Sequence, residues 1–288
     1  MLYRILTALV GIPLAFVLVF WPGGLPFAVA MGAISVLGAL EFYKGVRKIG
    51  ARPVEWAGLL AVLFFVFSAR TFRYEEGTTI GAIFPTALTL LLILSFTVEM
   101  IRRERAPILN VGSTVFGAIY VGWLISHLVV LRGVRLDVPE SELLHWNPLG
   151  DPGACLVMLT FLGTWACDTG AYFLGRSFGK TKLAPKLSPN KTWEGAVGGF
   201  GSSVVVTLIA GYFIHLPWVH CLALGALFGL FTQLGDLSES TIKRELDMKD
   251  FGTMVPGHGG ILDRFDSLLF TGPVAYYYAV LFLSHWLK

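Results

Sequence analysis

Long apolar runs separated by short polar connections make up most of this 288-residue chain. A helix needs about 20 mostly apolar residues to cross roughly 30 Å of hydrocarbon, because it rises ~1.5 Å per residue. Such runs are expected to be helices, since an open strand edge would leave backbone groups unpaired in lipid. We therefore predict an all-α fold, a polytopic transmembrane helical protein of about nine spans, at residues 4–21, 25–43, 54–69, 79–98, 111–131, 154–175, 195–214, 218–234 and 267–285.

The composition agrees with a protein built for lipid. Hydrophobic residues make up 55% of the chain, charged residues make up 14%, and the mean hydropathy is +0.69, whereas soluble domains carry roughly 25% charged residues. The net charge is only +3 and no polybasic tract occurs, so we expect no nucleic-acid partner. The three cysteines lie inside apolar runs without metal-ligand spacing, and we interpret them as small core residues.

The basic residues indicate how the helices are oriented. Of the 22 Lys and Arg residues, 17 lie near the N-terminus or in the even-numbered connections, and five lie on the opposite side. Because cytoplasmic connections carry an excess of Lys and Arg, we expect the N-terminus and the long connections 176–194 and 235–266 in the cytoplasm. We predict N-terminal membrane spans, about four helices, over 1–110 and a catalytic membrane region over 111–288.

The connection after the eighth run carries a polar stripe. If the helix continues past residue 234, four polar side chains at i, i+3, i+4 and i+7 share one helix face: Asp236, Glu239, Ser240 and Lys243. Carboxylate and ammonium groups would then lie side by side. A solvated helix end with ordinary ion pairs is the alternative that the stripe alone leaves open.

A glycine-rich turn follows over 256–260, with the sequence PGHGG and His258 at its centre. Such glycines permit unusual backbone angles and close approach to a ligand. We expect a helix after the turn, with Asp263 and Asp266 near its start, where the helix dipole tolerates negative charge and favours anionic ligands. An Asp at such a place is most often a capping residue. Together with Asp236 it can complete a hard-cation site, and oxygen ligands with phosphate partners suit Mg²⁺.

One carboxylate lies inside a predicted span. Asp168 is about two turns from the cytoplasmic end of the sixth run. A carboxylate costs ~2.5–3.5 kcal/mol at the bilayer centre and less near its edges, so it needs a partner or a polar cavity. We interpret Asp168 as functional, with structural hydrogen bonding as the alternative.

The connection 176–194 is rich in cations and hydroxyl groups. Its start is similar to a phosphate-binding P-loop, but the spacing is one residue short and a membrane helix precedes it instead of a strand. Its five cations suit the polyphosphate of a nucleotide or a phospholipid head group, although Arg176 and Lys182 fit ordinary positive anchors. The small residues over 195–203 predict close helix packing in the next span.

Taken together, the polar segments form one longer pattern. It runs through Ser240-x-x-Lys243-Arg244-x4-Lys249-Asp250 and Pro256-x-His258-Gly259-Gly260-x-x-Asp263-Arg264-x-Asp266, with upstream parts at Asp168-x-x-Ala171-Tyr172, Ser188-Pro189-Asn190-Lys191-Thr192-x-Glu194-Gly195 and Gly235-Asp236-x-x-Glu239-Ser240. This pattern strongly resembles the signature of the phosphatidate cytidylyltransferases, also called CDP-diacylglycerol synthases. The resemblance covers about residues 110–288 and says nothing about a role for the first hundred residues.

The resemblance implies an enzyme of phospholipid biosynthesis that joins phosphatidate to CTP, giving CDP-diacylglycerol and pyrophosphate. The chemistry is consistent, because a phosphomonoester with a second pKa of ~6 already carries a nucleophilic oxyanion at neutral pH. The enzyme has to hold two anions in line and neutralise the leaving pyrophosphate, which is a task for metal ions and for Lys or Arg.

These implications give each residue an expected role. Asp236 and Asp263 are the leading Mg²⁺ ligands and catalytic residues, with Asp168, Glu239 and Asp266 as further ligands or supporting groups and a second cation left open. Lys243 and Arg264 are expected to clamp phosphates, and His258 to assist the leaving group or to order its turn. The expected substrate-binding residues are Lys191, Thr192, Ser188, Asn190, Ser240, Arg244, Lys249, Gly259 and Gly260.

Two other kinds of function are alternatives. An ion-coupled transporter using Asp168 would spread polar residues through several spans near the midplane, whereas here they collect at one face. Another membrane nucleotidyltransferase or a lipid kinase is the closer rival; the CDP-alcohol phosphotransferases are disfavoured because no run of spaced aspartates follows an Asp-Gly pair. We expect a multi-pass protein of the cell (inner) membrane, among membrane lipids, with its active site facing the cytoplasm and homo-oligomer formation open.

Overall fold

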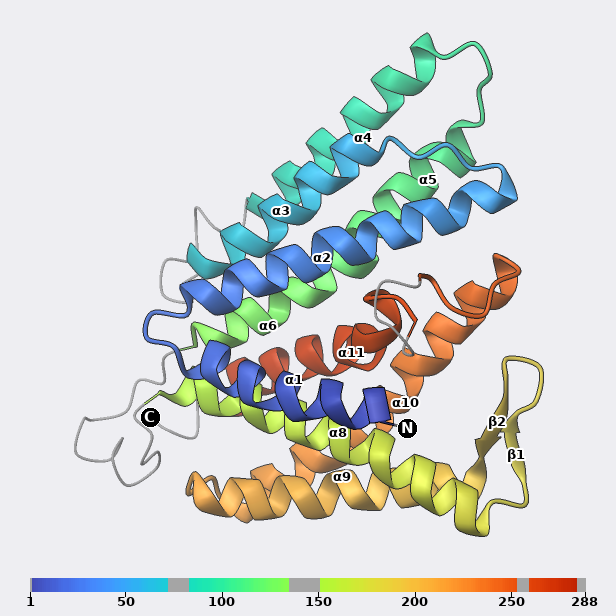
Figure 1. Ribbon diagram of the computed structural model, residues 1–288. Coiled ribbons are helices and arrows are strands. Elements are labelled where there is room, and N and C mark those ends of the chain that lie inside the picture. Colours follow the sequence, from blue (N-terminus) through green and yellow to red (C-terminus); the bar gives the residue numbers. More distant parts are fainter. Residues whose placement is uncertain (1, 72–82, 135–150, 253–258, 284–288) are drawn as a thin grey trace. The chain divides into compact units, whose positions relative to one another are not determined.

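The chain folds into two compact units whose residues alternate along the sequence. The computed structural model describes residues 2–71, 83–134, 151–252 and 259–283 (Figure 1). The first unit consists of Met1–Gly133 and Glu245–Phe265, and the second of Val134–Arg244 and Asp266–Lys288. The segment that carries part of the predicted signature, 245–265, therefore belongs to the unit of the N-terminal spans. The predicted boundary at residue 110 divides the chain by function and not by compactness, and it stays a prediction.

The first unit consists of helices joined by short connections. Pro107 at the first turn of α5 suits a helix start, because a proline there sacrifices no hydrogen bond, and Gly24 precedes α2 in a left-handed conformation at φ +64°. The elements are α1 (Leu2–Phe20), α2 (Leu25–Val46), the 3₁₀ turn η1 (Arg47–Ile49), α3 (Glu55–Thr71), α4 (Ile83–Ile101), α5 (Pro107–Gly117), the π-helical η3 (Ala118–Trp123) and α6 (Leu124–Arg132).

A buried tyrosine joins three of these helices. The hydroxyl of Tyr43 on α2 donates a hydrogen bond of 2.8 Å to the carbonyl of Thr114 on α5. Gly58 on α3 and Gly117 on α5 leave room for its ring, since a Cβ atom at either position would overlap the tyrosine. The core of the first unit is therefore packed around a large side chain that glycines on two neighbouring helices admit.

The second unit adds a small hairpin to its helices. The elements are α8 (Pro152–Phe178), β1 (Lys182–Ala184), β2 (Ser188–Thr192), α9 (Trp193–Phe213), α10 (Trp218–Glu245), α11 (Leu262–Tyr278) and the π-helical η4 (Ala279–Leu283). The first turn of α11, up to Phe265, belongs to the first unit. The strands are antiparallel and pair Lys182 with Thr192 and Ala184 with Ser188. The hairpin is not predictable from the sequence pattern, because strands this short and polar carry no hydrophobic alternation.

Small residues bring α8 and α9 close together. The buried stripe of α9 consists of Gly195, Gly199, Ser203, Thr207 and Gly211. A Cβ atom at Gly199 would stand 2.7 Å from the carbonyl oxygen of Cys167 on α8. The predicted small-residue packing of this span is therefore confirmed.

The described helices confirm the all-α polytopic class. Seven of them are long and apolar enough to cross a membrane within the described residues. The described apolar part of α1, Val10–Phe20, and the 17-residue α3 are shorter. All nine predicted runs coincide with helices, but a total of nine spans stays a prediction.

We expect Gly199→Ala to destabilise the second unit by about 1–3 kcal/mol, because its methyl group would press on the backbone of α8. Gly201→Ala is the matched control: nothing lies within 4 Å of a Cβ atom there, and alanine favours a helix by up to about 1 kcal/mol. Thermal unfolding of the detergent-purified variants checks this. Equal melting temperatures for the two variants would contradict the packing argument.

Candidate active site

The polar stripe predicted on α10 exists, because this helix continues to Glu245. Glu239 is fully buried and pairs with Lys243 one turn later. Ser240 is also buried, and its hydroxyl lies 3.5 Å from Oδ1 of Asp236. These four side chains lie along one face of the helix, while Thr241 and Arg244 beside them are exposed.

An ion pair connects the hairpin to this stripe. Nζ of Lys191 on β2 lies 2.5 Å from Oδ2 of Asp236, and the two side chains are 23% and 33% exposed. A second link follows two turns along α10, where Nε of Arg244 donates to the carbonyl of Leu187 at 3.0 Å. Two groups expected to handle phosphates, Lys191 and Arg244, thus lie on one side of the unit.

A second carboxylate joins the pair from α11. The helices α10 and α11 approach closely at Gly235, where a Cβ atom would stand 2.7 Å from the carbonyl oxygen of Asp266. The side chain of Asp266 is within electrostatic range of Asp236, Lys243 and Lys191. The second unit therefore brings together two aspartates and two lysines, all predicted as site residues.

This pair of aspartates fits a cation that the substrate also binds. Among the described residues, no group of three or more His, Cys, Asp or Glu side chains is placed to hold a metal. Mg²⁺ commonly takes one or two protein carboxylates and completes its shell with water and phosphate oxygens. Asp236 and Asp266 are two such carboxylates, while Glu239 pairs with Lys243 and its role as a ligand stays a prediction.

The other residues predicted in the connection 176–194 support the hairpin. Thr192 caps α9, its hydroxyl accepting a 3.2 Å hydrogen bond from the amide of Gly195. The carboxylate of Glu194 accepts hydrogen bonds of 3.1 Å from the amides of Lys180 and Thr181, which fixes the end of α8. On β2, Ser188 is half-buried and Asn190 is exposed. Their substrate contacts stay predictions.

The remaining signature residues lie in the first unit. Oδ2 of Asp263 accepts hydrogen bonds from the amides of Phe251 at 2.9 Å and Gly260 at 2.7 Å, so this aspartate ties the turn to the start of α11. Gly259 has φ +85°, an angle that glycine alone adopts at little cost. Asp263 therefore has the capping geometry named as its alternative, and its role as a ligand shared with Asp236 stays a prediction.

Three further predicted residues are exposed, and one lies outside the described residues. Lys249 and Arg264 are exposed in the first unit, and Asp168 is exposed on α8, ten residues before that helix ends. His258 falls within 253–258, outside the described residues. Roles for these four stay predictions.

Sequence reasoning missed two buried carboxylates of the first unit, Glu41 and Glu99, which are 7% and 2% exposed. Glu41 lies inside the predicted span 25–43, where an ionisable residue is itself a signal of function. That signal was used for Asp168, and it applies equally to Glu41.

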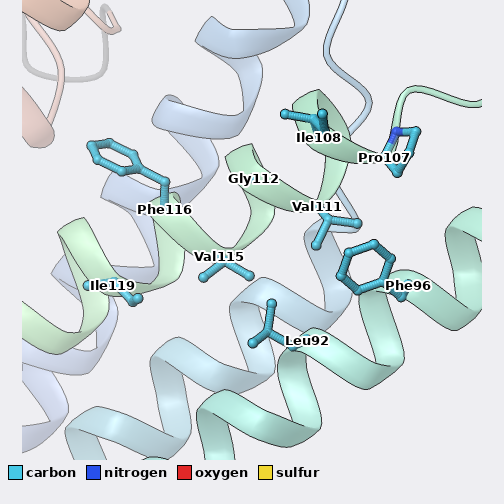
Figure 2. A pocket seen from close by; sticks show the side chains of 9 residues that line it. All are labelled: Leu92, Phe96, Pro107, Ile108, Val111, Gly112, Val115, Phe116 and Ile119. Atoms are coloured by element: carbon cyan, nitrogen blue, oxygen red, sulfur yellow. The ribbon is translucent and has the colours of Figure 1, made fainter.

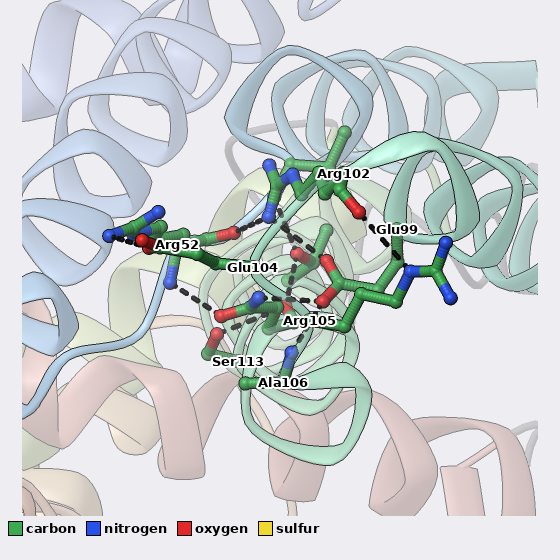
Figure 3. A network of polar contacts seen from close by, with 10 residues as sticks. Arg52, Glu99, Arg102, Glu104, Arg105, Ala106 and Ser113 are labelled. Atoms are coloured by element: carbon green, nitrogen blue, oxygen red, sulfur yellow. Dashed lines mark hydrogen bonds and ion pairs between the residues drawn. The ribbon is translucent and has the colours of Figure 1, made fainter.

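Glu99 organises a polar network at the end of α4 (Figure 3). Its carboxylate accepts hydrogen bonds from the amide of Ala106 at 2.7 Å, from Nδ2 of Asn110 at 2.9 Å and from Arg102 at 3.0 Å. Oδ1 of Asn110 in turn accepts from the amide of Arg52 at 2.7 Å. The network joins α4, α5 and the connection before α3, so we interpret Glu99 as structural.

A groove on the first unit has the wrong chemistry for a nucleotide. It runs between α4 and α5, and its lining includes Leu92, Phe96, Ile108, Val115 and Phe116 (Figure 2). These side chains are apolar and cannot bind a polyphosphate. The groove therefore adds no candidate to the charged cluster of the second unit.

The fold defines a multi-span helical membrane protein, and its second unit carries a cluster of two aspartates and two lysines. Comparison with known proteins supports that class: a model of the cytidylyltransferase family matches residues 2–282. The chain is 36% identical to a phosphatidate cytidylyltransferase of Synechocystis sp. and 34% identical to that of Bacillus subtilis, each over 97% of both chains. A phosphatidate cytidylyltransferase of Haemophilus influenzae is 31% identical over 96% of this chain and 97% of its own. The chain belongs to the cytidylyltransferase family, and it is an integral membrane enzyme that transfers nucleotidyl groups.

We expect Thr192→Ala to destabilise the second unit by about 1 kcal/mol, because it removes the hydroxyl that caps α9. Thr192→Ser is the matched control, since serine keeps the capping oxygen. Thermal unfolding measures the difference. If Thr192→Ala melts like the wild type but loses activity, the hydroxyl serves the substrate and not the helix.

Proposed function

We propose that this chain transfers the cytidylyl group of CTP to phosphatidate, producing CDP-diacylglycerol and pyrophosphate for phospholipid biosynthesis. The observation that carries this proposal is the cluster of Lys191, Asp236, Lys243 and Asp266 in a chain of the cytidylyltransferase family. The relatives named above are phosphatidate cytidylyltransferases, and this chain aligns with nearly their whole length. The cluster combines the carboxylates and the cations that a reaction between two phosphate anions needs.

The phosphate oxyanion of phosphatidate attacks the α-phosphate of CTP, and pyrophosphate leaves. The nucleophile is already ionised at neutral pH, so the protein has to align and neutralise rather than remove a proton. Lys191 and Lys243 supply the positive charge of the cluster, and each is paired with a carboxylate in the structure. In the complex, their ammonium groups bind phosphate oxygens.

We assign Asp236 and Asp266 as the carboxylates that hold Mg²⁺. When bound, the metal supplies charge neutralisation for the phosphates of CTP and of the leaving pyrophosphate. The fit rests on the approach of α10 to the backbone of Asp266 at Gly235 and on the electrostatic interaction between the two aspartates. Lys191 now supplies the positive charge next to Asp236, and this ion pair supports a cation at the same position.

The proposed site faces the cytoplasm in the cell (inner) membrane. The support is the excess of Lys and Arg in the even-numbered connections, which include the hairpin and the segment after α10. CTP is soluble and phosphatidate is a lipid, so a site at the membrane surface is where both can meet.

Purified protein given phosphatidate, Mg²⁺ and one of the four nucleoside triphosphates tests this function. We expect pyrophosphate release with CTP and conversion of the lipid to CDP-diacylglycerol, measured by coupled phosphate assay and lipid mass spectrometry. Release without phosphatidate, or transfer of a terminal phosphate to the lipid, would replace this proposal with a nucleotide hydrolase or a lipid kinase.

We expect Asp236→Asn to lower turnover about 100-fold or more, because the site loses one of the two carboxylates assigned to hold Mg²⁺. Omission of Mg²⁺ with EDTA present should abolish wild-type activity, and added Mg²⁺ should restore it. Asp247→Asn is the matched control, since Asp247 is exposed and asparagine also accepts its left-handed backbone at φ +47°. Near-normal turnover in Asp236→Asn, or activity that survives EDTA, would refute the metal assignment.

A further inference from the structure

Glu41 holds the start of α11 from the N-terminal spans. It lies on α2 with 7% of its surface exposed. Its Oε1 accepts a hydrogen bond of 3.0 Å from the amide of Ile261, and its Oε2 accepts one of 2.9 Å from the amide of Leu262. The first amides of a helix have no acceptor within that helix, so a carboxylate from another element supplies what α11 cannot.

Two glycines of the signature region leave the space that Glu41 occupies. A Cβ atom at Gly252 would overlap Oε1 of Glu41, and a Cβ atom at Gly260 would overlap both of its carboxylate oxygens. Two separate positions of the segment 245–265 thus lack side chains where this carboxylate lies. This close fit goes beyond what a helix cap requires, because a cap has to supply an acceptor oxygen but does not need glycines around that oxygen.

The turn is held from both sides. Glu41 binds the amides of residues 261 and 262, while Asp263 binds the amides of Phe251 and Gly260. Four backbone amides around the signature turn therefore donate to two carboxylates, and one of the carboxylates comes from a helix more than two hundred residues earlier. These hydrogen bonds fix the backbone at Phe251 and over residues 260–262.

We infer that Glu41 is a positioning residue for the signature turn and the first turn of α11, which gives the N-terminal spans a part in the reaction. The inference rests on the proposed function for its effect on turnover. Glu41 acts through the backbone of residues 260–262 and binds no substrate. Replacing Glu41 therefore slows the reaction, because the backbone of residues 260–262 shifts and displaces the signature residues next to it.

Kinetics of Glu41→Gln and Glu41→Ala test the inference. Glu41→Gln keeps the side-chain volume but offers one acceptor oxygen in place of two. We expect it to lower kcat about 10- to 100-fold with KM for CTP unchanged, as for a misplacement that affects the reacting geometry. Glu99→Gln is the matched control, because Glu99 is another buried carboxylate of the same unit that receives a backbone amide away from the signature turn. If Glu41→Gln and Glu99→Gln lost kcat equally, Glu41 would only stabilise the unit and would not position the signature turn.

Hydrogen–deuterium exchange gives a readout that does not depend on activity. The amides of Ile261 and Leu262 should exchange faster in Glu41→Gln and Glu41→Ala than in the wild type, while peptides of α4 and α5 should not change. Unchanged exchange at these two amides overturns the inference. If the wild-type protein made no CDP-diacylglycerol, the proposed function would fail while this measurement still tested Glu41.

A double-mutant comparison tests the close fit directly. Gly260→Ala places a methyl group against Glu41, so it should lower turnover in the wild-type background. In the Glu41→Ala background the space is open, and Gly260→Ala should then cost less than it does alone. Strictly additive losses would show that the two positions do not share this contact.

Discussion

A charge placed among apolar helices has to find its partner inside the protein, and this constraint shapes both units. Four charged side chains are buried in the described residues: Glu41, Glu99, Arg132 and Glu239. Each is matched. Glu41 and Glu99 accept backbone amides, Glu239 pairs with Lys243, and Arg132 donates to the backbone carbonyls of Val19 and Trp21 at the end of α1. An unpaired charge in these places would cost several kcal/mol, so the partners fix which helix ends and connections can lie there.

The helices were predictable because their signal is local. An apolar run long enough to cross lipid has no alternative to a helix, and the stripe on α10 followed from spacing alone once that helix continued to Glu245. The residues Lys191, Asp236 and Asp266 were predictable because they lie in short polar segments that resemble the family signature. Their arrangement was not predictable: the 2.5 Å pair between Lys191 and Asp236 joins a hairpin to a helix through contacts distant in sequence.

Glu41 shows most clearly where sequence reasoning stops. Its position inside an apolar run marks it as unusual, but nothing in the run tells which amides it will bind 220 residues later. The glycines of the signature were predicted to admit a ligand. At Gly260 the space they leave is filled by a carboxylate of the protein itself. A missing side chain reports that something approaches the backbone, and only the structure tells what it is.

Charge matching also constrains how the proposed site can receive its substrates. Both substrates are anions, and the two lysines of the cluster are already paired with carboxylates. If phosphate oxygens take Lys191, Asp236 loses its partner near Asp266, and the two carboxylates repel each other. A divalent cation on the aspartates removes that repulsion and binds the same phosphates. Metal and nucleotide should therefore bind cooperatively, each weakly without the other, because either one alone leaves part of the cluster unbalanced.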